Sequence, residues 1–156
     1  MLSQDDYYNV CSKMNVTSID MILDYNGKYL LGKRINEPAK DTYFVIGGVI
    51  QKHETLNHAF KRISSNELGI ELAMDSFKFH VISQHWYDKN FKDDIFGTHY
   101  ISLSYKRSLT DDEFLKIHID DQHSEMVMLT VNELMKCDTV HANTKGFFDS
   151  SYFSVK

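Results

Sequence analysis

The sequence contains very little cysteine and proline. Two cysteines, Cys11 and Cys137, are too few for a disulfide framework and lack the spacing of metal ligands, so two reduced thiols of a cytoplasmic protein are the simplest interpretation. The single proline, Pro38, leaves no proline-rich stretch that could form a stiff linker. These absences favour a single domain over residues 1–156.

Long hydrophobic runs and clusters of basic residues are also missing. No segment approaches the roughly 18 apolar residues of a membrane-spanning helix, and the acidic N-terminal residues do not resemble a secretory signal peptide. The net charge is −5, without a lysine or arginine cluster. We therefore expect no membrane and no nucleic-acid partner. An anionic ligand would need a cation and a few arginines to offset the negative field of the chain.

The residues that are present suffice for a packed core. The apolar fraction is 42%, and ten Phe, nine Tyr and one Trp argue against disorder. A chain of this length can bury roughly two-thirds of its extended surface. The composition therefore predicts a folded domain that needs no covalent cross-link.

Local patterns predict an alternation of strands and helices. Ser3 begins a short helix to about Lys13, and residues 17–25 alternate as a strand with Asp20 on its polar side. Asn26-Gly27 predicts a tight hairpin turn. Further strands are expected at 28–34, 43–46, 77–87, 98–107 and 125–129, and helices at 56–68, after the Thr130–Glu133 capping box and at 143–152. The polar 88–97 loop is long enough to reach over a site. The pattern predicts an α/β sandwich.

The segment from Gly47-Gly48 through Glu54 to the helix at 56–68 carries the main chemical signal. Glu67 lies on the helix stripe that otherwise faces the core, where a carboxylate is costly unless it is paired or bound to a metal. The alternative is that the helix end frays and Glu67 reaches water. Glycines let backbone oxygens turn toward an ion. This order of residues can hold a divalent metal against a diphosphate.

The segment resembles the signature of the Nudix hydrolases, in which a glycine, glutamates and an arginine recur at fixed spacing. Gly48, Glu54, Arg62, Glu67 and Gly69 match that spacing. Residues 63 and 66, isoleucine and asparagine here, replace two glutamates of the signature. The resemblance implies a Nudix-like mixed-sheet α/β (α+β) sandwich with flanking helices. The missing acids imply one Mg²⁺ per subunit, with Mn²⁺ as a substitute.

The same two losses mark one branch of that family, the GDP-mannose mannosyl hydrolases, and similarity to this branch extends along nearly the whole chain. Matching stretches include Leu30-Leu31-Gly32-Lys33-Arg34, Thr98-His99-Tyr100, Gln122-His123 and Val140-His141-Ala142-Asn143. The branch hydrolyses GDP-mannose or GDP-glucose to GDP and free sugar. Water attacks the anomeric carbon with inversion. The resemblance thus implies a GDP-hexose substrate and a homodimer.

Site residues follow from this resemblance, position by position. The Mg²⁺ ligands correspond to the Gly47 carbonyl, Glu67 and Gln122, and His123 corresponds to the general base, whose ordinary pKa suits that role. Without the resemblance, Gln122-His123 would be interpreted as a polar surface loop. The remaining positions are Arg34 at the diphosphate, Asp20 and His85 near the sugar, Tyr100 facing the substrate, Leu2 and Tyr7 near the nucleotide, and Arg62 orienting Glu54.

The chain departs from the branch at Val49, where the family has an arginine after the glycine pair, and at Ile46, where it has a proline. Loss of such a donor can cost on the order of 3 kcal/mol in the transition state. Either Lys52 or Lys33 substitutes, or turnover is slow, or the substrate differs. Two other functions stay open: a module that binds nucleotide sugars without turnover, and a pyrophosphohydrolase of another nucleotide sugar.

Overall fold

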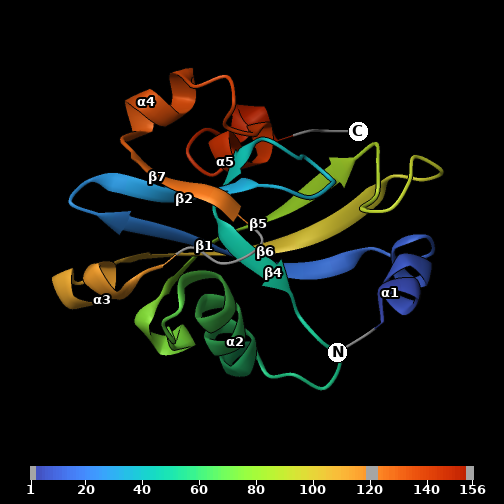
Figure 1. Ribbon diagram of the computed structural model, residues 1–156, viewed down its shortest axis with the longest axis horizontal. Coiled ribbons are helices and arrows are strands. Elements are labelled where there is room, and N and C mark those ends of the chain that lie inside the picture. The colour runs from blue at the N-terminus through green and yellow to red at the C-terminus, as the bar shows by residue number, and fades with distance from the viewer. Residues whose placement is uncertain (1–2, 119–122, 154–156) are drawn as a thin grey trace.

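The computed structural model describes residues 3–118 and 123–153, with only the backbone of His123 and Ser124. A mixed sheet forms the middle layer (Figure 1). Its strands are β1 (Val16–Tyr25), β2 (Lys28–Arg34), β3 (Tyr43–Phe44), β4 (Ile46–Val49), β5 (Lys78–Tyr87), β6 (Thr98–Ser108) and β7 (His123–Leu129). The order is β3-β2-β1-β6-β5, with β4 paired to β1 and β7 paired to β2. The predicted mixed α/β sandwich is confirmed.

Helices cover both faces of this sheet. They are α1 (Gln4–Cys11), α2 (Leu56–Leu68), α3 (Asp111–Lys116), α4 (Val131–Lys136) and α5 (Ala142–Gly146), with 3₁₀ turns at Met74–Ser76 and Ser150–Tyr152. Figure 1 shows α2 and α3 on one side of the sheet and α4 and α5 on the other. Within the described ranges, no helix is long and apolar enough to cross a membrane.

The central strand β1 is buried on both faces. Ile19, Met21 and Leu23 belong to the core beneath α2, whereas Ile22 belongs to a second core against α4 and α5. The prediction of one apolar and one polar side for this strand was wrong. β1 pairs in parallel with β6 and antiparallel with β4, so neighbours surround it on both edges, and the helices then cover both of its faces.

Local capping explains where most helices begin. Ser3, Thr55 and Thr130 accept backbone N–H groups at the starts of α1, α2 and α4, and the caps at Ser3 and Thr130 were predicted. Helix α3 was not predicted, although Thr110 and Glu113 form a capping box that the sequence displays. The hairpin turn at Asn26-Gly27 has the two positive φ angles, 52° and 77°, that a type I′ turn requires.

Two predicted elements are divided in the structure. The expected strand at 43–46 splits because β3 pairs with β2, whereas β4 pairs with β1 and continues through the glycines. The expected helix at 143–152 ends early, because Asp149 has extended backbone and caps a separate 3₁₀ turn. Only the first of these differences affects the site, since it makes the glycine pair part of a strand.

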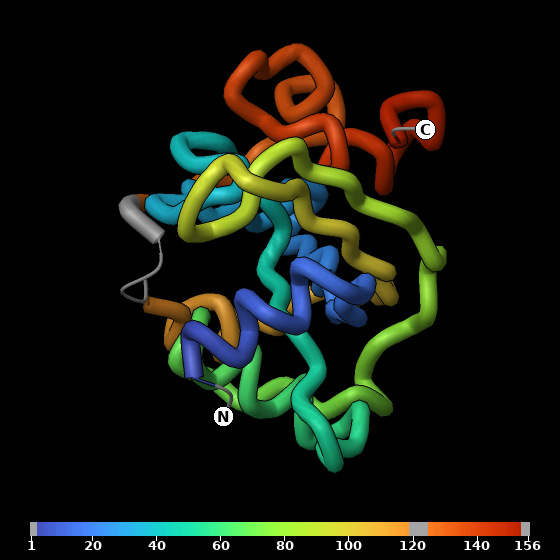
Figure 2. The backbone as a smooth tube through the Cα atoms, turned by 90° about the vertical axis from the view of Figure 1, so that its right-hand side faces the viewer, coloured from blue at the N-terminus to red at the C-terminus, as the bar shows by residue number. Residues whose placement is uncertain are grey.

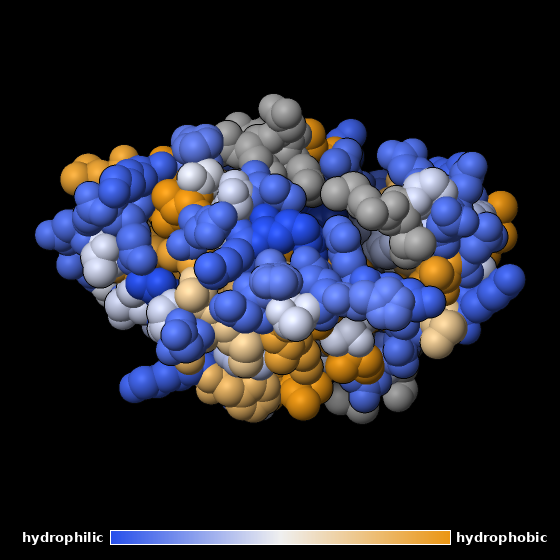
Figure 3. All heavy atoms as spheres, turned by 90° about the horizontal axis from the view of Figure 1, so that it is seen from below, coloured by the Kyte–Doolittle hydropathy of each residue, from blue (hydrophilic) through white to orange (hydrophobic). Residues whose placement is uncertain are grey.

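Helix α2 turns a polar side to solvent. Asn57, His58, Ser65 and Asn66 are exposed, whereas Phe60 and Ile63 are buried against the sheet. The face of the molecule seen from below is accordingly covered mainly by hydrophilic side chains (Figure 3). Gly69 ends the helix with a φ of 70°, as predicted for a left-handed cap.

Candidate functional site

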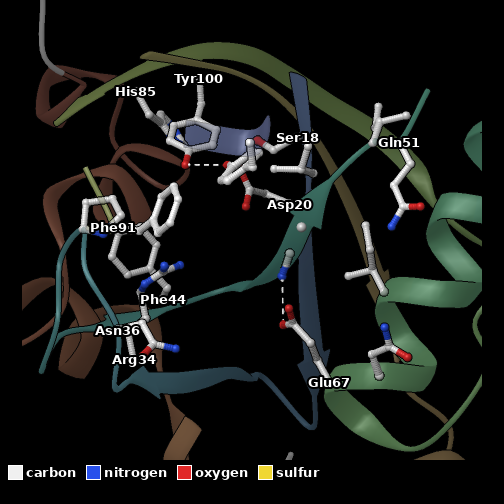
Figure 4. Close-up of a pocket in the computed structure, with 18 of the residues that line it drawn as sticks. Ser18, Asp20, Arg34, Asn36, Phe44, Gln51, Glu67, His85, Phe91 and Tyr100 are labelled. Atoms are coloured by element: carbon white, nitrogen blue, oxygen red, sulfur yellow. Dashed lines mark hydrogen bonds between the residues drawn. The ribbon is translucent and has the colours of Figure 1, made fainter. Parts of the chain in front are cut away.

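A cavity of about 710 Å³ opens between the glycine strand β4, the end of α2 and the N-terminal helix α1. Its walls come from α1, β1, β2, β3, β4, α2, β5, β6 and the 88–97 loop. They include the predicted residues Tyr7, Asp20, Arg34, Gly47, Arg62, Glu67, His85 and Tyr100. Figure 4 shows Arg34, Phe44 and Phe91 on one side of the cavity and Glu67 on the other. The fold thus gathers residues from eight helices and strands around one space.

The backbone of Gly47 faces Glu67 at the edge of the sheet. The Gly47 N–H donates to Glu67 Oε2 at 3.3 Å, and Glu67 is only 8% exposed. The Ile50 N–H donates to Thr17 O, which sets the alternation of hydrogen bonds between β4 and β1. By that alternation, both the N–H and the C=O of Gly47 point away from β1. The Gly47 carbonyl therefore lies on the edge that carries Glu67.

A glycine is required at position 47 by close approach. A Cβ there would lie 2.5 Å from both Asp20 Oδ1 and Ile19 O. Asp20 fills this space and accepts a hydrogen bond from Ser102 Oγ. Burial raises the pKa of Asp20 to about 6, although the Ser102 hydrogen bond and the Arg34 charge both oppose the rise. The carboxyl group of Asp20 therefore lies against the glycine strand.

Glu54 and Arg62 form a bidentate ion pair that fastens the loop after β4 to helix α2. Arg62 Nε and Nη2 donate to the two Glu54 oxygens at 2.7 and 2.8 Å, and Nη2 also donates to the Val49 carbonyl at 2.8 Å. Glu54 in turn accepts the Gln51 N–H at 3.0 Å. The Arg62 hydrogen bonds are the first cause that lowers the pKa of Glu54. The pair links the loop after β4 to helix α2, and its supporting role at a catalytic site stays a prediction.

His85, Tyr100 and Tyr7 lie on neighbouring parts of the cavity wall. His85 is 4% exposed, lies 3.0 Å from Ser83 Oγ, and has its pKa lowered to about 4 by burial. It is therefore a neutral side chain near pH 7. The hydroxyls of Tyr7 and Tyr100 share a hydrogen bond of 2.9 Å, which joins helix α1 to strand β6.

Arg34 belongs to a stack that sequence reasoning did not assign. Its guanidinium lies 5.6 Å from the centre of the Phe44 ring, and His141 stacks on Phe44 at 4.4 Å with 28° between the planes. His141 Nδ1 accepts the Asn143 N–H, and burial lowers the pKa of His141 to about 4. The matching stretch around His141 was the available signal, but no role could be read from it.

The structure separates the two lysines that could replace the family arginine. Val49 and Lys52 both line the cavity. Lys33 instead lies 3.5 Å from Glu125 and 5.9 Å from the centre of the Tyr43 ring, outside the lining residues. Because side chains alternate along β2, Lys33 and Arg34 point to opposite sides. Lys52 is the better placed substitute.

Three predicted site residues lie wholly or partly outside the part of the chain that the structure describes. Leu2 and Gln122 lie outside the described residues, as does the side chain of His123. The described backbone of His123 pairs with that of Arg34 in the β2–β7 ladder. The backbone of the predicted base thus lies at the start of β7, which is hydrogen-bonded to the strand that carries Arg34.

The donor atoms at the Gly47–Glu67 edge suit a hard divalent cation. A carboxylate and a main-chain carbonyl are oxygen ligands, and Mg²⁺ commonly binds through one or two carboxylates while keeping water and phosphate ligands. Among the side chains that the structure describes, no group of three or more His, Cys, Asp or Glu could hold a metal. The residues therefore offer oxygen ligands to a divalent cation, whose coordination substrate and water would complete.

Comparison with known proteins identifies the family. The NUDIX domain model matches residues 14–150. The chain belongs to the Nudix family. It is 31% identical over 125 residues to the low-salt glycan biosynthesis protein Agl8 of Haloferax volcanii, covering 80% of this chain and 77% of that protein. Members of the family are hydrolases that generally use divalent metals, and the Nudix part of the sequence resemblance is confirmed.

Solved structures with a similar fold support the same assignment. A MutT NUDIX hydrolase from Burkholderia pseudomallei has a TM-score of 0.70 at 17% identity, covering 88% of this chain and 98% of the other. The NUDIX domain of Shewanella oneidensis NrtR, solved with ADP ribose, has a TM-score of 0.63 at 13% identity, covering 96% and 99%. At these identities the likeness concerns the fold alone.

Proposed function

We propose that this protein hydrolyses GDP-mannose, or a related GDP-hexose, to GDP and free sugar by attack of water at the anomeric carbon with inversion. The observation that carries this proposal is the shared cavity of Asp20, Arg34, Gly47, Glu67, His85 and Tyr100. All six belong to the set inferred from the resemblance to the GDP-mannose mannosyl hydrolase branch. The similarity to a glycan biosynthesis protein agrees with a nucleotide-sugar substrate.

The two sides of the cavity can bind different parts of the substrate. The Arg34 guanidinium offers donors to the diphosphate, and its stacking on Phe44 limits the entropy lost on binding. A bound Mg²⁺, held by Glu67, the Gly47 carbonyl and Gln122, would neutralise the charge that develops on the leaving diphosphate. Asp20 and Tyr100 offer polar groups to the hexose. His123 is proposed to remove the proton from the attacking water.

The loss of two signature acids favours this reaction over cleavage between the phosphates. Ile63 lines the cavity, and a Cβ at Gly48 would lie 3.1 Å from its side chain, so this position supplies apolar contact to β4 where the signature has a carboxylate. Asn66 also lines the cavity but contributes no charge. Fewer carboxylates leave fewer ligands for a second metal.

Product analysis in ¹⁸O-labelled water tests the proposal. The protein is incubated with GDP-mannose and Mg²⁺, and the products are examined by mass spectrometry. Attack at carbon yields GDP and labelled mannose. Formation of GMP and mannose 1-phosphate, or label confined to phosphate, would instead identify a pyrophosphohydrolase or attack at phosphorus and would refute the proposal.

Two variants connect the reaction to the proposed residues. His123→Gln should lower kcat by about 10²–10⁴-fold if His123 is the base. Glu67→Gln should abolish Mg²⁺-dependent turnover, and chelation with EDTA should do the same to the unmodified protein. Glu71→Gln is the matched control, because Glu71 is an exposed residue that lies 3.9 Å from Lys61 and does not line the cavity. Equal losses in Glu67→Gln and Glu71→Gln would contradict the metal assignment.

Val49 supports a second candidate function, a module that binds nucleotide sugars with weak or no turnover. In that case calorimetry would detect GDP-mannose binding while long incubation yields no sugar. A homodimer and a cytoplasmic location remain predictions from the branch. Sedimentation of the purified protein tests the first of these.

A further inference from the structure

The wall of the cavity differs in chemistry from one part to another. The part formed by Gly47, Glu67 and Lys52 is polar, whereas α1 and the 88–97 loop contribute aromatic rings. The Phe91 ring lies 5.3 Å from that of Tyr7, tilted by 30°. The Tyr7 and Tyr100 hydroxyls hydrogen-bond to each other and leave one O–H donor between them, whereas the Phe91 ring offers a ligand no polar group. An occupant of this part should itself be flat and apolar on its faces.

Phe91 is held in place by its buried neighbour Asn90. Asn90 is 1% exposed. Its side-chain oxygen accepts the N–H groups of Lys92 and Asp93 at 2.8 and 2.9 Å, and its nitrogen donates to Asp93 Oδ1 and Phe96 O at 2.7 and 3.1 Å. These four hydrogen bonds lie within residues 90–96 and hold the turn in one conformation. The ring that follows Asn90 is therefore positioned before any ligand arrives.

The loop is also fastened to helix α1. Tyr8 OH donates to Asp93 Oδ2 at 2.7 Å, and the Tyr8 ring lies 4.8 Å from the Phe96 ring. Lys92 Nζ lies 3.1 Å from Asp5 and 5.1 Å from the centre of the Tyr8 ring. Figure 2 shows α1 and this loop on the same side of the molecule, although they are far apart in sequence. Two segments thus build one aromatic wall.

We propose that the nucleobase of the substrate stacks on the ring of Phe91. Asn90, Tyr8 and Asp93 act as positioning residues that hold this ring in place. The inference rests on the proposed function, because it assigns the nucleotide end of the same cavity. A nucleobase is planar, and its π face can stack on an aromatic side chain whichever base it is. A hexose carries several hydroxyls that need polar partners, and Asp20 provides these elsewhere in the cavity.

Binding measurements with and without a base test this assignment. GDP and inorganic pyrophosphate are titrated in the presence of Mg²⁺ by calorimetry, against the unmodified protein, Phe91→Ala, Phe91→Leu and Phe91→Tyr. We expect Phe91→Ala and Phe91→Leu to weaken GDP binding by about 5- to 100-fold. Pyrophosphate binding should change less than twofold, and Phe91→Tyr should retain GDP affinity. Phe91→Leu keeps an apolar side chain, so it guards against simple loss of folding in the alanine variant.

A control and a positioning variant complete the experiment. Phe79→Ala removes a ring that is 56% exposed and does not line the cavity, so GDP binding should stay unchanged. Asn90→Ala should weaken GDP binding in the same direction as Phe91→Ala, again with pyrophosphate spared. Equal GDP affinity in Phe91→Ala and the unmodified protein, or equal losses for pyrophosphate, would overturn the inference.

The outcomes also separate this inference from the proposed reaction. If Phe91→Ala weakens GDP-mannose but not GDP, the ring contacts the hexose and the base assignment is wrong. If Phe91→Ala weakens GDP alone while the unmodified protein forms GMP and mannose 1-phosphate, the stacking on Phe91 stands and the reaction is refuted. If GDP binds the unmodified protein no better than pyrophosphate does, the stacking on Phe91 is refuted whatever the reaction.

Discussion

Two buried histidines should make the stability of this protein depend on pH. His85 is 4% exposed, His141 stacks on Phe44, and burial is the largest cause that lowers the pKa of each imidazole to about 4. In an unfolded chain a histidine titrates near pH 6.5. As the pH falls, the unfolded state takes up protons before the folded state does. The contribution of these two neutral imidazoles to the free energy of unfolding is therefore fully present above pH 6.5. It is lost as the pH falls from 6.5 to 4.

The size of the effect follows from the same values. At about 1.4 kcal/mol for each pH unit, the interval from 6.5 to about 4 amounts to about 3 kcal/mol for His85. This is a large part of the roughly 5–15 kcal/mol that stabilises a typical domain. Urea unfolding from pH 7.5 to 4.5, followed by Trp86 fluorescence, measures it.

The matched variant is His85→Gln, which keeps a polar side chain but does not titrate. Carboxylates also titrate in the lower part of this range, and they contribute equally to both proteins. The difference between the two stability curves should therefore change by about 3 kcal/mol across the interval. Parallel curves for the two proteins from pH 7.5 to 4.5 would refute the argument.

Three substitutions test the glycine strand and its support. Gly47→Ala places a Cβ 2.5 Å from Asp20 Oδ1 and should cost about 1–3 kcal/mol in urea unfolding; an unchanged midpoint would contradict the close approach. Arg62→Lys keeps the charge but loses the bidentate contact to Glu54, and it should also cost about 1–3 kcal/mol of unfolding free energy. As a control, Lys61→Ala removes the surface ion pair with Glu71 and should cost less than about 1 kcal/mol. Val49→Arg should raise kcat for GDP release by up to about 10²-fold. Equal rates in the two proteins would show that an arginine at this position does not contribute to turnover.

Local signals in the sequence predicted much of the secondary structure. The caps at Ser3, Thr55 and Thr130 and the turn at Asn26-Gly27 depend on residues within four positions of each other, so short-range rules suffice for them. The division of the 43–46 strand depends on which strands pair with it. Sequence alone does not specify those partners.

Within the candidate site, spacing along the chain determined the residues of one segment. Glu54 and Arg62 are eight positions apart and meet through the loop and helix that the pattern already predicted. The Asp20 environment could not be anticipated, because its rise in pKa comes from burial between strands that are remote in sequence. A polar residue on an alternating strand gives no indication that the opposite face is covered as well.

By itself, the sequence determined the glycine pair, the acid at the end of the following helix, and the family to which both belong. Only the tertiary structure decided that Phe44 and His141 stack behind Arg34 and that Phe91 stands beside Tyr7. The physical reason is that backbone propensities and caps act over a few residues, whereas stacking and burial require segments that meet only after the sheet has formed.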